Sequence, residues 1–364
     1  MRIAVASESA PGESRVALVP ELVGKLIAAG YQVAVQPGAG AGSMFADAAY
    51  AASGAEIGAT ALDGADVVIS VQPLDPELVE QLSPGAATLS FFPIAARTDD
   101  LVIRRERRLT TFGMEYVPRI SRAQSMDALS SQSLVAGYRG AIVAAGRLRQ
   151  FFPLSMTAAG TVKPAQVVVL GAGVAGLQAI ATCRRLGAVV KGYDVRAAAA
   201  EEIRSMGAQA IDLALPTLEG AGGYAREMTE ERAQKQRELL TPYIAAADAL
   251  ITTAAVPGRT APVLVTAEMV RQMKPGSVVV DLAAESGGNV EGVVAGSVIN
   301  IDGVQLWGGA NIPSQMPAPA SRLYAQNVLN VILLMTREGL FAPDFSDEIV
   351  AAMCVTHDGE VRRS

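Results

Sequence analysis

Three glycines, Gly171, Gly173 and Gly176, have the spacing G-x-G-x-x-G within the segment VVVLGAGVAG. A β-branched apolar run precedes them and an apolar helical pattern follows, so they lie on a predicted strand-to-helix turn. In such a turn the first glycine permits a tight bend, the second lets a pyrophosphate approach backbone N–H groups, and the third lets the helix lie close to the strand. The spacing predicts a dinucleotide site; a tight turn without a ligand is the alternative.

An acidic residue stands where a ribose contact is expected. Asp194 follows the run KGY, 18 positions after Gly176. A carboxylate there accepts hydrogen bonds from the adenosine ribose and repels a 2′-phosphate, which favours NAD(H) over NADP(H). Arg196 leaves two roles open, because its side chain can be a direct ligand or a solvated or adenine-stacking surface.

A second candidate site is the polar stretch PRISRAQSMDALSSQS, residues 118–133, in a chain otherwise rich in Ala, Val, Gly and Leu. It opens a helix expected over about residues 126–150, between two predicted α/β units. Small-molecule sites often form at such junctions. The simpler alternative is a capped helix start, with Asp127 or Ser125 as the N-cap.

Other chemistries have little support in the sequence. The single histidine, His357, is predicted to lie in a surface loop, and the chain has no H-x-x-x-H, C-x-x-C or G-x-S-x-G motif. Zinc sites and serine-hydrolase sites depend on such patterns, so neither is expected, and the metal prediction is none. The two cysteines, Cys183 and Cys354, are predicted to be small buried residues in a reduced compartment.

Composition narrows the class of protein. The 364 residues exceed the usual size of one hydrophobic core, which favours two domains. A net charge of −6 gives no general attraction to nucleic acid. The longest apolar runs fall far short of the ~20 residues that cross a bilayer, and the N-terminus has no apolar signal region. We therefore expect a cytoplasmic chain without a membrane span.

Short strands alternate with helical stretches along the whole chain. The runs RIAVA, YQVAVQ, ADVVISV and ATLSFF are predicted strands, and Pro20 and Gly30 are expected to begin and close a helix. The rhythm restarts near residue 165 and ends in a helical stretch at 321–340. This pattern predicts an α/β fold with two Rossmann-like, doubly wound parallel-sheet domains separated by a cleft. The expected boundaries are 1–127 plus 322–364 and 128–321.

Several loop motifs occur in a consistent order and carry a family resemblance. They are PRISRAQSMDALSSQSLVAGYRG, VVVLGAGVAGLQAIATCRRLGA, YDVRAA, GGYAREM, ITTAAVPG, MKPGSVVVDLAAESGGN and CVTHDG. Together they resemble the soluble α subunit, or domain I, of proton-translocating NAD(P) transhydrogenases, over nearly the whole chain. The resemblance implies a fold shared with alanine dehydrogenase.

Two positions separate the two activities. The alanine dehydrogenases that this chain resembles carry a lysine and a histidine at two strand ends, where this sequence has Gln72 and Pro93. Neither side chain can shuttle a proton. Arg15 is retained, and without an acid-base partner it can hold an anion or brace the domain. Hydride transfer between two nicotinamide rings needs no proton transfer at the reacting carbons, so positioning becomes the main task.

The resemblance gives the polar stretch a function. It implies that Arg119, Gln124 and Asp127 lie beside the dihydronicotinamide, with Ser130 in the same binding wall. An amide can donate to and accept from a carboxamide, and a carboxylate can take its N–H or brace an arginine.

The resemblance also implies a mobile loop at 220–228, GAGGYAREM, in which Tyr224 closes over the nucleotide; an ordinary surface loop is the alternative. Further implied nucleotide contacts are Val174, Ala175, Val195, Arg196, Gly223, Gln236 and Ala255. Gln236 also fits a solvated helix, TEERAQKQRELL.

The implied function is an NAD(H)-binding subunit that transfers hydride to NADP(H) on a partner subunit, coupled to proton translocation by membrane-spanning partners. The implied state is a homodimer, peripheral at the inner face of the cell membrane. Two alternatives remain: an amino-acid dehydrogenase similar to alanine dehydrogenase, and an NADH-sensing binding module.

Overall fold

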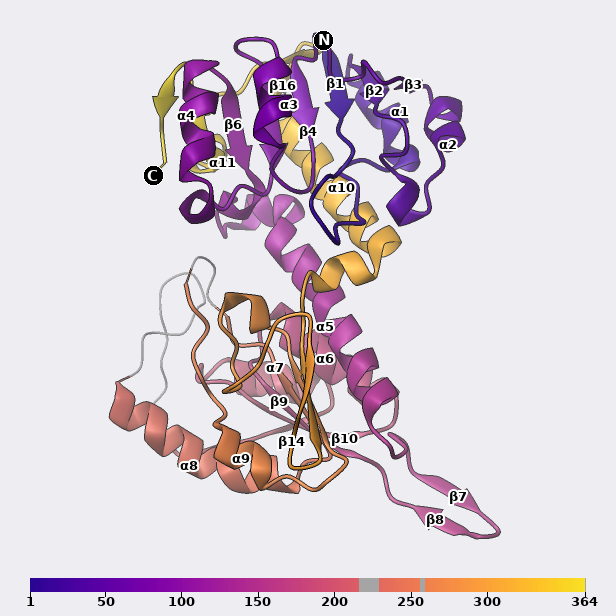
Figure 1. Cartoon of the computed structure of the whole chain (residues 1–364), viewed down its shortest axis with the longest axis vertical. Coiled ribbons are helices and arrows are strands. Elements are labelled where there is room, and N and C mark those ends of the chain that lie inside the picture. The colour runs from indigo at the N-terminus through magenta and orange to yellow at the C-terminus, as the bar shows by residue number, and fades with distance from the viewer. Residues whose placement is uncertain (216–228, 256–258, 364) are drawn as a thin grey trace. The chain divides into compact units, whose positions relative to one another are not determined.

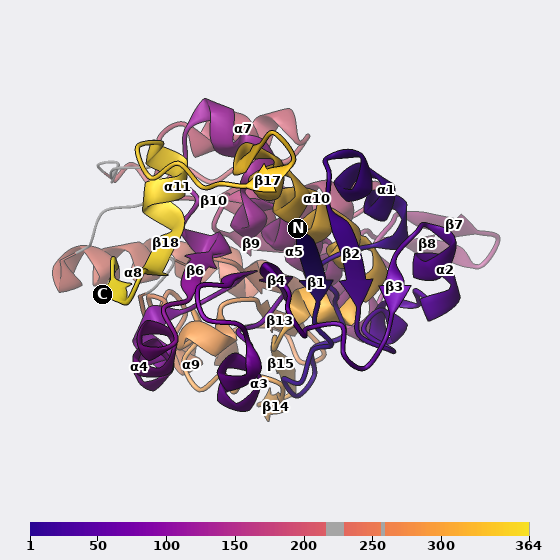
Figure 2. The same ribbon diagram turned by 90° about the horizontal axis from the view of Figure 1, so that it is seen from above.

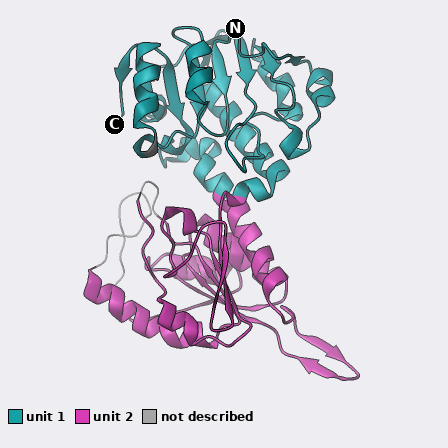
Figure 3. Ribbon diagram, viewed as in Figure 1, with its two compact units in different colours: residues 1–132, 313–364 teal, residues 133–312 magenta. Residues whose placement is uncertain are grey.

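The computed structural model describes residues 1–215, 229–255 and 259–363 (Figure 1). It divides into two compact units, residues 1–132 with 313–364 and residues 133–312 (Figure 3). The first division falls inside helix α5, Ala128–Arg147. The C-terminal segment thus belongs to the same unit as the N-terminus.

The first unit is built on an eight-stranded sheet of order β19-β18-β6-β5-β4-β1-β2-β3. Strands β1 to β6 run parallel, whereas β18 and β19 are antiparallel additions at one edge. The strands are β1 Arg2–Val5, β2 Gln32–Val35, β3 Glu56–Ile57, β4 Val67–Ile69, β5 Ala87–Ser90, β6 Thr110–Gly113, β18 Cys354–His357 and β19 Glu360–Val361. The helices are α1 Pro20–Ala28, α2 Asp47–Ala52, α3 Pro76–Gln81, α4 Thr98–Glu106, α10 Pro317–Leu334 and α11 Glu348–Met353.

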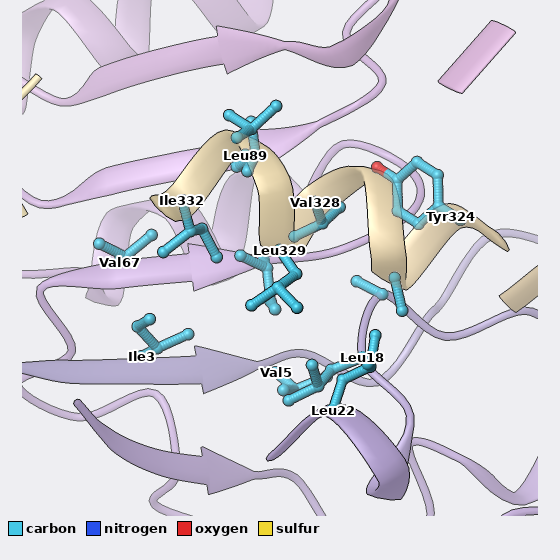
Figure 4. Close-up of a cluster of buried hydrophobic side chains, with 14 of the residues drawn as sticks. Ile3, Val5, Leu18, Leu22, Val67, Leu89, Tyr324, Val328, Leu329 and Ile332 are labelled. Carbon is cyan, nitrogen blue, oxygen red and sulfur yellow. The ribbon is translucent and has the colours of Figure 1, made fainter. Parts of the chain in front are cut away.

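Strand alternation gives this sheet two apolar faces. Ile3 and Val5 join the cluster beneath α1, α10 and α11, whereas Ala4 joins the cluster beneath α3. Figure 4 shows Val328 and Leu329 of α10 among the strand side chains of the first cluster, and Figure 2 shows α3 and α4 on the opposite side of the sheet. A parallel sheet covered on both faces explains why its strands read as continuous apolar runs.

The second unit has a seven-stranded sheet of order β11-β10-β9-β12-β13-β15-β14. All neighbours are parallel except β14 and β15. Its strands are β9 Gln166–Leu170, β10 Val189–Tyr193, β11 Gln209–Ala210, β12 Ala249–Thr252, β13 Val278–Asp281, β14 Val298–Ile301 and β15 Val304–Gly308. Helices α6 Val174–Arg185, α7 Ala199–Ser205, α8 Glu230–Ala246 and α9 Ala267–Arg271 cover the sheet, and a hairpin of β7 Ser155–Thr157 and β8 Gly160–Val162 forms a separate two-stranded sheet.

The order of the second sheet reverses between β9 and β12. From β9 the chain proceeds through β10 and β11 on one side, and β12 then pairs with the other side of β9. In open α/β sheets ligands bind outside the carboxyl ends of the strands at such a switch point. The loops that follow β9 and β12 are therefore the walls of the expected site.

These sheets confirm the predicted α/β class with two Rossmann-like, mainly parallel sheets, and Pro20 begins α1 as expected. Two local predictions were wrong. His357 ends strand β18, where its Nδ1 lies 3.0 Å from Thr110 Oγ1, because the C-terminal segment pairs with β6. The last long helix stops at Leu334, and a short hairpin of β16 Thr336–Arg337 and β17 Leu340–Phe341 follows it.

Candidate functional site

The predicted glycine turn lies at the carboxyl end of β9. Gly171 has φ of +96°, a conformation that favours glycine. A Cβ added to Gly176 would lie 1.9 Å from the Gly171 carbonyl oxygen, so only glycine lets α6 come this close. Both residues are required by the packing of the turn itself.

Gly173 has a different character. It is the N-cap of α6, and an added Cβ would meet no atom within 4 Å. Val174, the first residue of α6, is 41% exposed. Open space in front of the N–H groups of a twelve-residue helix fits a pyrophosphate, since the helix dipole favours an anion there.

Asp194 directly follows β10 and turns back to the glycine turn. Its Oδ2 accepts a hydrogen bond from Ala172 N at 2.8 Å. Its Oδ1 accepts from Arg196 N at 3.0 Å and from Arg196 Nε at 2.9 Å. Val195 packs against the core cluster on this face of the sheet. The carboxylate and the arginine that were predicted near a ribose are therefore an ion pair.

The polar stretch divides into exposed and capping residues. Arg119 and Gln124 are exposed. Asp127 precedes α5 and accepts from Ser130 N at 2.9 Å and from Ser130 Oγ at 2.6 Å. Asp127 is thus the N-cap of α5, which was one of the two caps considered for this helix. These four residues belong to the first unit, whereas the glycine turn belongs to the second.

The remaining predicted contacts fall into two groups. Gln236 is buried in α8 and accepts from Tyr193 Oη at 3.1 Å, so it is not one of the solvated residues of that helix. Ala255 is exposed after β12, and Ala175 is half-buried in α6. Gly223 and Tyr224 lie outside the described residues, together with the rest of the 220–228 loop.

Arg15 is engaged by an internal carboxylate. Its Nη2 lies 2.6 Å from Glu13 Oε2, and its Nη1 donates to Gln132 Oε1 at 2.9 Å. Gln72 Nε2 also donates to Glu13, at 2.9 Å. The Arg15 hydrogen bonds hold the pKa of Glu13 at about 2 against its desolvation. The contacts brace the domain, which was one of the two roles considered for Arg15.

Glu8 adds a carboxylate to this cluster. It accepts from the backbone N–H groups of Val71 and Gln72 at 2.6 and 3.0 Å. Burial raises the pKa of Glu8 to about 7, opposed by these hydrogen bonds. At the other discriminating position, Pro93 is exposed at the N-cap of a short 3₁₀ helix. No sequence motif pointed to Glu8 and Glu13, because most of their partners lie far away along the chain.

A buried network beside the glycine turn was also missed. Asp281 at the end of β13 and Asn289 in the following loop are both 0% exposed. Asn289 pairs with the backbone of Ala254, and Thr253 Oγ1 donates to the Gly171 carbonyl at 3.2 Å. The motif DLAAESGGN contains both buried residues, but no spacing rule assigns them a role.

Two further features limit the possible chemistry. Within residues 1–215, 229–255 and 259–363, no group of three His, Cys, Asp or Glu side chains could hold a metal ion. No helix in this same part of the chain has both the length and the apolar character to cross a membrane. Cys183 and Cys354 are free and buried, as predicted.

Comparison with known proteins places the chain in a family. Residues 4–136 match the N-terminal domain, and residues 140–364 the C-terminal domain, described as alanine dehydrogenase/PNT. The chain belongs to the alanine dehydrogenase/PNT family. This family member is 46% identical to an NAD(P) transhydrogenase subunit alpha of Rhodospirillum rubrum, with 99% of this chain and 97% of the relative covered.

Two more relatives frame the alanine dehydrogenase/PNT family member. The crystal structure of a transhydrogenase from Sinorhizobium meliloti matches with a TM-score of 0.88 and 42% identity, covering 99% of this chain and 98% of that one. An alanine dehydrogenase of Mycolicibacterium smegmatis is 30% identical, over 99% of this chain and 94% of the relative. The family thus includes relatives named for both activities.

Proposed function

We propose that this protein is the NAD(H)-binding subunit of a proton-translocating transhydrogenase, which delivers hydride to NADP+ held on a partner subunit. The observation that carries the proposal is the state of Gln72. Its side-chain amide donates to Glu13, so a residue that cannot shuttle protons stands where the alanine dehydrogenases resembled here carry lysine. The higher identity to a relative named as a transhydrogenase subunit, 46% against 30%, supports the same choice.

The residues have distinct roles in this proposal. The open N-terminus of α6 at Gly173 would hold the pyrophosphate, and Asp194 would accept from the adenosine ribose. NADH, when bound, supplies the hydride. Arg119, Gln124 and Asp127 would orient the carboxamide, with Ser130 beside them. Orientation is the chain's main contribution to rate, because a hydride moves well only between rings held at near-attack separation.

The proposal includes partners. The NADP(H)-binding subunit and the proton path belong to other chains, and this subunit would lie at the inner face of the membrane through them. A second copy of this chain is the further expected partner. The β7–β8 hairpin supports a dimer, since it exposes Met156 at 74%, Leu154 at 54% and Val162 at 42%. Apolar side chains gathered on one projection favour burial against another surface.

The test combines binding and transfer. The purified chain should bind NADH and not NADPH in calorimetry. Addition of an NADP(H)-binding transhydrogenase subunit with an NADP+ analogue should then start hydride transfer from NADH. Turnover of pyruvate, ammonia and NADH by the chain alone would instead establish an amino-acid dehydrogenase, and NADH binding without any transfer would establish a sensor.

A further inference from the structure

Asn289 makes a two-way backbone pairing with Ala254. Its Oδ1 accepts from Ala254 N at 2.9 Å, and its Nδ2 donates to Ala254 O at 2.7 Å. The same Nδ2 donates to Pro262 O at 2.9 Å. One side-chain amide thereby replaces the neighbouring strand that Ala254 lacks beyond the end of β12.

Asp281 fixes Asn289 in turn. Its Oδ2 accepts from the backbone N–H groups of Asn289 and Val290 at 2.7 and 3.0 Å, and its Oδ1 accepts from Ala283 N at 2.9 Å. These three donors to the buried carboxylate are main-chain groups. Buried polar groups that are fully paired hold a single conformation, because any other arrangement leaves one of them unpaired.

The preceding residue in the loop after β12 reaches the glycine turn. Thr253 Oγ1 donates to Gly171 O at 3.2 Å, and Thr253 N donates to Leu170 O at 2.8 Å. A Cβ on Gly171 would lie 2.6 Å from Thr253 Oγ1. Residues 253 and 254 therefore fit against the turn that would receive the pyrophosphate, on the other side of the switch point.

We infer that Asn289 is a positioning residue for the nucleotide: through Ala254 and Thr253 it fixes the loop after β12 against the glycine turn. The inference rests on the proposed NAD(H) site. Asn289 lies in the loop after β13 and acts through the backbone it holds. Its loss would let residues 253–255 move away from Gly171, and the walls of the switch point would no longer match a dinucleotide.

The experiment compares NADH affinity with stability. Asn289→Ala should raise the NADH Kd about tenfold, because two hydrogen bonds that set one wall are lost. Hydrogen exchange of the Ala254 amide should accelerate in the same variant. Asn300→Ala is the matched control, because Asn300 also binds a backbone N–H, that of Gly303, but in an exposed turn. It should leave the NADH Kd unchanged.

A second variant covers the case in which Asn289→Ala does not fold. Thr253→Val removes only the hydroxyl contact to Gly171 and should raise the NADH Kd about threefold to tenfold with little change in Tm, while Thr253→Ser restores binding. A wild-type Kd in Thr253→Val, or in folded Asn289→Ala, overturns the inference alone. Failure of the wild-type protein to bind NADH would remove the proposed function, and the inference with it.

Discussion

Arg196 and Asp194 form an ion pair that holds both sides of the Ala172 peptide backbone. Arg196 Nε donates to Asp194 Oδ1 at 2.9 Å, Ala172 N donates to Asp194 at 2.8 Å, and Arg196 Nη2 donates to Ala172 O at 3.2 Å. The arginine next to the expected ribose position is thus neutralised by the carboxylate that would bind that ribose. This relationship explains how an arginine near the site is compatible with selection of NAD(H).

The first prediction concerns this selection. Asp194→Ala should weaken NADH binding and strengthen NADPH binding, narrowing the selectivity by about tenfold to a hundredfold, since a charge-assisted contact is lost and Arg196 can turn to a phosphate. Calorimetry with both nucleotides measures it. Asp194→Ala combined with Arg196→Met should lose the gain in NADPH affinity. A single variant that still rejects NADPH would show that Arg196 does not reach the ribose.

The second prediction separates the two kinds of glycine. Gly176→Ala should destabilise the fold by about 2 kcal/mol or more, because its Cβ would lie 1.9 Å from a backbone oxygen. Gly173→Ala should keep the wild-type Tm, since its Cβ enters open space, but should weaken NADH binding by occupying the place of the pyrophosphate. Thermal unfolding and NADH titration distinguish them. Equal NADH affinity in Gly173→Ala would argue against a pyrophosphate at this turn.

The third prediction separates capping from chemistry at Asp127. Asn is as good an N-cap as Asp, so Asp127→Asn should leave the stability of α5 nearly unchanged. Hydride transfer should slow by roughly tenfold to a hundredfold, more than NADH binding weakens, if the residue positions the ring. Ser130→Ala, which removes the 2.6 Å partner of Asp127, is the control for the cap. Weaker NADH binding with an unchanged transfer rate would contradict a positioning role for Asp127.

The fourth prediction is a pH dependence from Glu8. Burial raises the pKa of Glu8 from 4.5 to about 7, so the folded state binds this proton more tightly than the unfolded state. The contribution of Glu8 to the free energy of unfolding should therefore fall as pH rises from about 4.5 to about 7, by a total of about 3 kcal/mol, and stay constant above. Glu13 has a lowered pKa, so its contribution is lost in a different window, as pH falls from 4.5 towards 2.

Urea unfolding at several pH values measures this effect. Burial also raises the pKa values of Glu115 and Asp281, so the difference between wild type and Glu8→Gln isolates Glu8. The variant should lose the fall in stability between pH 5 and pH 7. Parallel curves for the two proteins would show that Glu8 does not titrate in this range.

The amino-acid sequence by itself determined the local features. Apolar runs specified the parallel strands, Pro20 began a helix, and the glycine spacing located the turn between β9 and α6. These features depend on φ/ψ preferences and on side-chain periodicity over a few residues, which are legible in any single segment. Asp194 could be located for the same reason, because a strand and a helix of ordinary length separate it from the glycines.

The tertiary structure alone decided which distant groups meet. Arg15 pairs with Gln132, and Asn289 pairs with Ala254, across 117 and 35 positions of sequence. His357 became a strand residue only because the last segment pairs with β6. Each outcome depends on burial, since in water these polar groups would bind solvent equally well. In the core they must find one another, and only the fold fixes which partners are within reach.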